Sequence, residues 1–182
     1  MKPATWSAGT VTPAVMNTCI RDAYSEVSGA VYGILHTSGD IAGAPATVTE
    51  MYFKKSQTRN MSVVTKNGYP SALKVTKAGM YVVEYTACAQ IDATNGALQS
   101  HLVSYVKVNG DWAHRGIYTA RTAYQQVSVT KGLLSLKVGD TVTAHTYTDA
   151  GRSANYVVNG DCAASNRLSL SRFGDYPWVD LP

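Results

Sequence analysis

The side chains best suited to chemistry in this sequence are four histidines, and their spacing matches no common catalytic arrangement. They stand at His36, His101, His114 and His145. No two of them lie four residues apart, so the HExxH motif of zinc hydrolases is absent. The GxSxG, GxGxxG and phosphate-loop motifs are absent as well. The sequence therefore predicts a protein that is not an enzyme and that binds no cofactor.

Three cysteines, Cys19, Cys88 and Cys162, are the other candidates for metal binding or redox chemistry. They are odd in number, far apart in the chain, and form no CxxC pair. This pattern favours neither a zinc site nor a disulfide framework. We therefore expect three reduced and mostly buried thiols.

The composition indicates a β-rich body that other protein partly covers. Charged residues make up 15% of the 182 residues, against an average of about 25%. Twelve tyrosines and fifteen glycines accompany them. The net charge of +4 is spread along the chain, with no basic block longer than Lys54-Lys55. Nucleic-acid binding, which needs clustered basic residues, is not expected.

No membrane-spanning or secretory segment is expected either. No apolar run reaches the roughly 18 residues that a membrane helix needs. The first six residues, Met1 to Trp6, lack the apolar centre of a secretion signal. We therefore expect synthesis in a cytoplasm and no membrane insertion.

The first 28 residues differ in pattern from the rest of the chain. Thr12-Pro13 is a helix start signal, because threonine caps helices and proline suits the first helical position. Apolar residues from Val15 to Ala23 then recur at helical spacing, which predicts a helix over 13–26. A helix this short is marginal alone and must lie against another surface.

From Ala30 onward, β-prone segments alternate with turn residues. The expected strands include 47–53, 61–65, 81–90, 101–108, 112–118, 124–136, 141–147 and 167–172. The dipeptides Asn67-Gly68 and Asn109-Gly110 favour tight hairpins between them. This pattern predicts an all-β sandwich or jelly roll over 29–172, followed by a tail over 173–182.

Four segments of this body, in order, resemble the C1q/TNF-like jelly-roll family over roughly residues 45–172. They are Ala78–Tyr85, Val106–Gly110, Leu136–Val142 and Arg167–Ser171. The chain departs from the family before the last strand, where it has Ala164-Ser165-Asn166. The resemblance implies a jelly-roll sandwich that assembles as a homotrimer.

Residues 5–22 resemble the opening of many tailed-phage minor structural proteins, of the minor tail or decoration type. The matching positions are Trp6, Gly9, Asn17, Ile20, Arg21 and Asp22. This resemblance implies a bacteriophage virion protein, made in the bacterial host cytoplasm, whose segment 1–28 attaches to other capsid or tail proteins. Capsid decoration (a head protein) and a minor tail or spike protein both remain open.

Some C1q-like heads carry calcium, which several oxygen ligands would have to hold. The candidate oxygens here are those of Asp92–Gly96, Asp149 and Asp161. The first group is typical of an ordinary turn, since Asn95-Gly96 favours one. We therefore expect no metal ligands.

Two further features concern partners. The tail carries Phe173, Tyr176 and Trp178 together with two prolines, which suits either an extended contact with a neighbouring protein or disorder. The body carries many aromatics, namely Tyr105, Trp112, Tyr118, Tyr124, Tyr147 and Tyr156. We expect most of these to fill the roll and the threefold seam. The alternative function is a receptor-binding adhesin that uses them to recognise a host surface protein or glycan.

Overall fold

The computed structural model describes residues 30–36, 47–90, 100–120, 125–148 and 166–175. The predicted helix over 13–26 and the N-terminal segment therefore lie outside the described residues. The chain divides into two compact units, Met1–Ala30 and Val31–Pro182. All the strands described below belong to the second unit. Within the described residues there is no helix long and apolar enough to cross a membrane.

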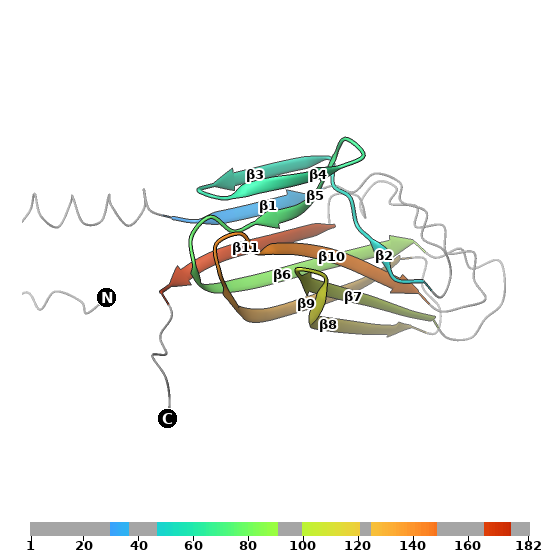
Figure 1. The fold of residues 1–182 in the computed structure, drawn as a ribbon. Helices are drawn as coiled ribbons and strands as arrows, with labels where there is room; N and C mark the ends of the chain where they lie inside the picture. Colours follow the sequence, from blue (N-terminus) through green and yellow to red (C-terminus); the bar gives the residue numbers. More distant parts are fainter. Residues whose placement is uncertain (1–29, 37–46, 91–99, 121–124, 149–165, 176–182) are drawn as a thin grey trace, which may run out of the picture. The chain divides into compact units, whose positions relative to one another are not determined.

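Eleven strands make up the described part of this unit (Figure 1). They are β1 (Tyr32–His36), β2 (Thr49–Glu50), β3 (Lys55–Arg59), β4 (Ser62–Lys66), β5 (Tyr69–Lys74), β6 (Gly79–Gln90), β7 (Ser100–Val108), β8 (Asp111–Ala120), β9 (Gln125–Leu136), β10 (Thr141–Thr148) and β11 (Arg167–Gly174). A five-stranded sheet has the order β3-β1-β11-β6-β9. In the six-stranded sheet, five strands have the order β4-β5-β10-β7-β8. The sixth strand, β2, pairs with His145 and Thr146 of β10, further along β10 than the residues that pair with β5.

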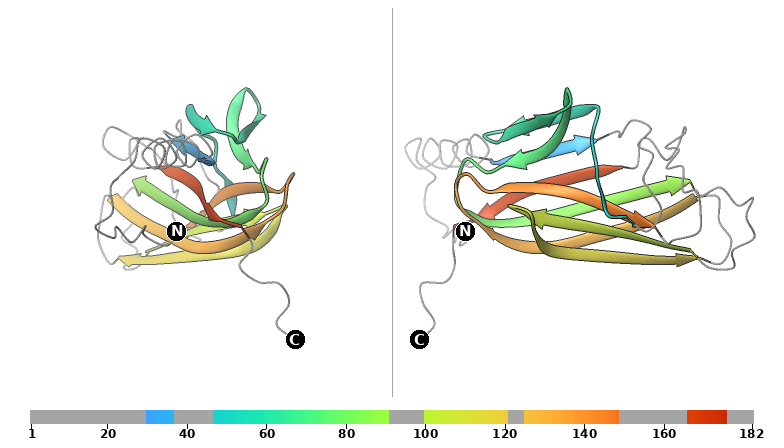
Figure 2. Two further views of the ribbon diagram at one scale, coloured as in Figure 1. Left: turned by 90° about the vertical axis from the view of Figure 1, so that its left-hand side faces the viewer. Right: turned by 45° about the vertical axis from the view of Figure 1, so that its right-hand side comes forward.

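The two sheets form an antiparallel sandwich. Strands of both sheets run in roughly the same direction (Figures 1 and 2). The first and last strands, β1 and β11, pair side by side, with Ile34 opposite Ser169. This arrangement confirms the predicted all-β jelly-roll sandwich.

The core lies between the sheets and follows from strand alternation. In β6, Tyr81, Val83 and Tyr85 are fully buried, because every second side chain of a strand points to the same face. The two tyrosine hydroxyls are not left unpaired: that of Tyr85 lies 2.6 Å from Thr146 Oγ1 of the other sheet, and that of Tyr81 donates to the Lys77 carbonyl. Burying these aromatic rings therefore leaves no unsatisfied hydroxyl.

The β7–β8 turn and the β9–β10 turn, which both carried the family resemblance, are joined by hydrogen bonds. Asn109 and Gly110 both have positive φ, as the predicted β7–β8 hairpin requires. The Asn109 side chain donates to Asp140 Oδ1 (2.8 Å) and accepts from the Thr141 amide (2.9 Å). Asp140 in turn accepts from the Lys137 amide (2.7 Å). These contacts tie the β9–β10 turn to the end of β7.

The expected strand over 47–53 is wrong in length. Only Thr49–Glu50 pairs with β10. The Met51 amide still donates to Ala144 of β10, but the Phe53 amide donates to Pro70 of β5. The segment thus crosses from one neighbour to another while burying both side chains. Strand β3, whose five residues are all exposed, was not predicted.

Strands β8 and β9 approach closely where the two sheets meet. A Cβ atom on Gly116 of β8 would lie 2.2 Å from the carbonyl oxygen of Val129 of β9. A Cβ on Gly132 of β9 would lie equally close to the His114 imidazole of β8. Beside them, Ser104 Oγ of β7 lies 2.8 Å from Ser128 Oγ and 2.6 Å from Thr130 Oγ1. Glycine, serine and threonine side chains therefore allow the edge strands β8 and β9 of the two sheets to pack closely together.

We predict that Gly116→Ala destabilises the fold, because the added methyl would overlap backbone that cannot rotate away. Overpacking of this kind costs about 1–3 kcal/mol, measurable by urea unfolding. Gly174→Ala is the matched control, since a Cβ there meets nothing within 4 Å. Equal stability of the two variants would show that β8 and β9 are not packed this closely.

Candidate functional site

The outward face of the five-stranded sheet carries several exposed apolar side chains. Its exposed large side chains are Tyr32, Val82, Val127, Val129 and Leu133. Leu133 of β9, 58% exposed, lies directly across from Val82 of β6. Val127 and Val129 follow on the same face of β9, because they alternate with the buried Ser128 and Thr130. We call this the five-stranded face.

The five-stranded face also carries a charged cluster of one acidic and two basic side chains. The Glu84 carboxylate of β6 lies 3.0 Å from Lys131 Nζ of β9 and 3.6 Å from Arg167 of β11. Exposed pairs like these contribute little to the stability of a single chain, typically below about 1 kcal/mol. They do neutralise the one acidic group on this part of the sheet.

The outward face of the six-stranded sheet carries a different cluster, made of aromatic and basic side chains. The Tyr105 and Trp112 rings lie 4.7 Å apart between centroids, and the His145 ring lies 6.5 Å from that of Trp112. Lys107 Nζ sits 3.8 Å from the centroid of Trp112, within range of a cation–π contact. These side chains come from three adjacent strands, β8, β7 and β10.

A β-bulge places Trp112 on this face. Val106 pairs with His114, whereas the next residue, Lys107, pairs with Trp112, so Ala113 is an extra residue in β8. Simple alternation would put Trp112 on the same side as His114, which points inward at Gly132. The bulge reverses the side to which Trp112 points, as bulges next to functional sites often do.

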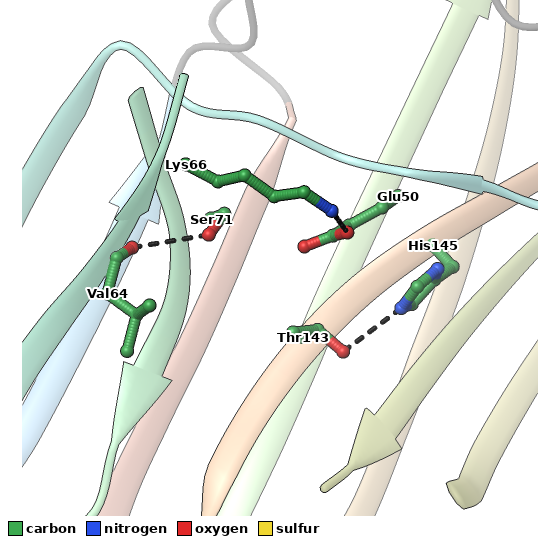
Figure 3. Close-up of polar contacts among 6 residues, drawn as sticks. All are labelled: Glu50, Val64, Lys66, Ser71, Thr143 and His145. Carbon is green, nitrogen blue, oxygen red and sulfur yellow. Dashed lines mark hydrogen bonds and ion pairs between the residues drawn. The ribbon is translucent and has the colours of Figure 1, made fainter. Parts of the chain in front are cut away.

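Figure 3 shows two polar contacts between side chains of the six-stranded sheet. Lys66 Nζ of β4 forms an ion pair with Glu50 of β2 at 2.7 Å. This contact raises the pKa of Lys66. On β10, Thr143 Oγ1 and His145 Nε2 lie 3.0 Å apart. Because Lys66 pairs with Glu50, the Glu50 carboxylate already has a counterion.

His145 is held in its neutral form. Burial disfavours the imidazolium and lowers the pKa of His145 to about 4, with further lowering by nearby Lys107. Glu50 opposes this shift, and Lys66 adds to it. At neutral pH the ring is therefore an uncharged hydrogen-bonding group.

The site residues predicted at the N-terminus lie outside the described residues; these are Trp6, Gly9, Asn17, Ile20, Arg21 and Asp22. The same holds for Tyr176 and Trp178 of the tail, and for the calcium candidates Asp92–Gly96, Asp149 and Asp161. Phe173, the remaining tail candidate, lies within β11 next to its last residue and has an exposed ring. Across the described ranges, no three His, Cys, Asp or Glu side chains gather as a metal site would need.

The expectation of a reduced thiol at Cys88 is wrong. Cys88 is disulfide-bonded, not a reduced thiol. Its backbone is also held by the buried Asn166, whose side chain bonds both the amide and the carbonyl of Cys88 (3.0 and 2.8 Å). Trp112, one of the aromatics of which most were expected to fill the roll and the threefold seam, lies outside the roll and is 57% exposed on the six-stranded sheet. Sequence alternation could not reveal the bulge that puts it there.

Comparisons with known proteins bear on the fold alone. No protein-family model matches the chain, and no curated protein matches its sequence. The crystal structure of murine APRIL at pH 8.0, from the TNF family, superposes with a TM-score of 0.52 at 15% identity, covering 79% of this chain and 99% of that one. Murine APRIL at pH 5.0 gives a TM-score of 0.49 at 12% identity, with the same coverage. The chain adopts a TNF-like jelly-roll fold.

We predict that His145 makes stability fall as pH is lowered from about 6.5, the unfolded pKa, towards the folded value of about 4. In that window the unfolded chain binds a proton that the folded chain does not. The variant His145→Gln should show a flatter pH dependence of the free energy of unfolding. Denaturant titrations of both proteins across this range provide the measurement, and superimposable pH profiles would contradict it.

Proposed function

We propose that this chain is a non-enzymatic structural protein that assembles as a homotrimer through the five-stranded face, and that segment 1–28 attaches the trimer to a bacteriophage particle. The observation that carries the proposal is the row of exposed apolar side chains on one sheet. The C1q/TNF resemblance implies the trimer, and the residues Trp6 to Asp22 support the phage assignment through their resemblance to virion proteins.

Burial of the five-stranded face supplies the driving force. Fully burying a valine or leucine side chain is worth about 1.5–3 kcal/mol. Val82, Val129 and Leu133 together offer enough exposed surface for several such contributions. The low charge content, 15% of residues, agrees with a surface that is largely covered.

The Glu84 cluster suits such a seam. A lone buried carboxylate would oppose association, because its desolvation costs several kcal/mol. Here Lys131 and Arg167 already lie beside it. A closed ring of three copies then satisfies every interface without leaving an open end for further growth.

Two positions on the particle fit this module. The N-terminal motif is common in proteins described as tail proteins, which favours a minor tail or spike. The short chain carries no coiled-coil heptads or shaft repeats, which favours a decoration protein lying close to the capsid.

The wild-type protein should be a trimer at micromolar concentration, measured by light scattering after size exclusion. Leu133→Glu should yield folded monomers, because three carboxylates would be buried in the seam. Val138→Glu is the control: it adds the same charge at an exposed residue of the β9–β10 turn and should leave the trimer intact. A folded wild-type monomer would contradict the proposed assembly.

Attachment has a separate test. Deleting residues 1–28, or combining Trp6→Ala with Ile20→Ala, should leave a soluble trimer that is missing from purified virions. Truncating such large apolar side chains at an interface removes contacts worth about 2–5 kcal/mol. The protein in virions is quantified against its level in the lysate. Normal incorporation of the variants would exclude this segment as the anchor and point to the tail from Phe173.

A further inference from the structure

A pocket opens on the six-stranded sheet, away from the proposed seam. Its volume is about 410 Å³, within the roughly 300–1,000 Å³ of small-molecule sites. The lining residues are Val48, Tyr105, Trp112, Ala113, His114 and Arg115. Two large aromatic rings, two apolar side chains, one imidazole and one guanidinium thus line one concave place.

The aromatic wall is exposed although a cation already covers part of it. Trp112 keeps 57% of its surface accessible with Lys107 Nζ above the ring. Packing within the sheet does not require this placement, since regular pairing would send residue 112 inward. The bulge at Ala113 turns the ring outward beside Tyr105. The fold therefore presents a rigid aromatic platform to solvent.

The polar wall is positively charged. Arg115 lies directly across from Tyr105, and no described residue forms an ion pair with its guanidinium. The other charges nearby are Lys107, the acidic Asp111 at the start of β8, and Glu50, which Lys66 already neutralises. Arginine presents parallel N–H donors that match the two oxygens of a carboxylate.

We infer that this pocket binds a sugar residue that carries a carboxylate, such as a uronic or sialic acid within a glycan. A pyranose ring has a face of C–H groups, which packs on an aromatic ring, and a rim of hydroxyls, which needs hydrogen-bonding partners. Trp112 and Tyr105 supply the packing surface, and Arg115 holds the carboxylate. This inference goes beyond the structural role proposed above, and it depends on one protomer only.

The test uses the full-length protein and two acidic probes, trigalacturonate and sialyllactose, titrated by calorimetry and by saturation-transfer NMR. The uncharged counterparts are methyl-esterified trigalacturonate and lactose. We expect at least one acidic probe to bind and its uncharged counterpart to bind about tenfold more weakly or not at all, since a charge-assisted hydrogen bond is lost.

Variants assign the binding to this pocket. Trp112→Ala and Arg115→Gln should each weaken binding of the acidic probe by about tenfold or more. Tyr69→Ala, at an exposed aromatic of the β4–β5 hairpin, should leave it unchanged. Because all three side chains are exposed, each variant should melt like the wild type and remain a trimer.

Three results would overturn the inference. They are no binding of either acidic probe, equal binding of acidic and uncharged probes, and undiminished binding by Trp112→Ala and Arg115→Gln. The failure of the proposed assembly is distinguishable from these, because a monomeric wild-type protein that still binds the acidic probe would refute the trimer alone.

Discussion

A β-strand sends successive side chains to opposite sides of its sheet, and this constraint on β6 (Gly79–Gln90) organises the whole sandwich. Tyr81, Val83 and Tyr85 point inward and, with the facing sheet, make the core. Val82 and Glu84 must then point outward. Nothing in core packing requires the outward residues to be apolar, and the exposed Val82 beside Leu133 is the observation on which the proposed contact with a partner copy rests.

Most of the fold could be predicted because alternation and turn chemistry are local. Neighbouring residues alone predict the alternation of β6 and the hairpin turn at Asn109-Gly110, where both residues have positive φ. Strand β3 could not be predicted, since its residues are polar and exposed and only pairing with β1 makes them a strand. The disulfide bond of Cys88 could not be predicted either, because three cysteines far apart in the sequence give no local signal of pairing.

The aromatic cluster was less predictable than the strands. Tyr105 and Trp112 were noticed as aromatics, but Arg115, Lys107 and His145 join them only through the register of three strands and one bulge. A bulge reverses the alternation on which sequence reasoning relies. Here the bulge turns Trp112 outward beside Tyr105 and Lys107, which gives the six-stranded sheet an aromatic and basic outward face.

The central claim is that the five-stranded face, not the six-stranded one, joins the protomers. Two exposed tyrosines make a matched pair for testing it: Tyr32 of β1 on the five-stranded face and Tyr69 of β5 on the other sheet. Each is replaced in turn by a photo-crosslinking benzoyl-phenylalanine. Irradiation should link protomers covalently from position 32 and leave them unlinked from position 69. Crosslinking from position 69 alone would contradict the account.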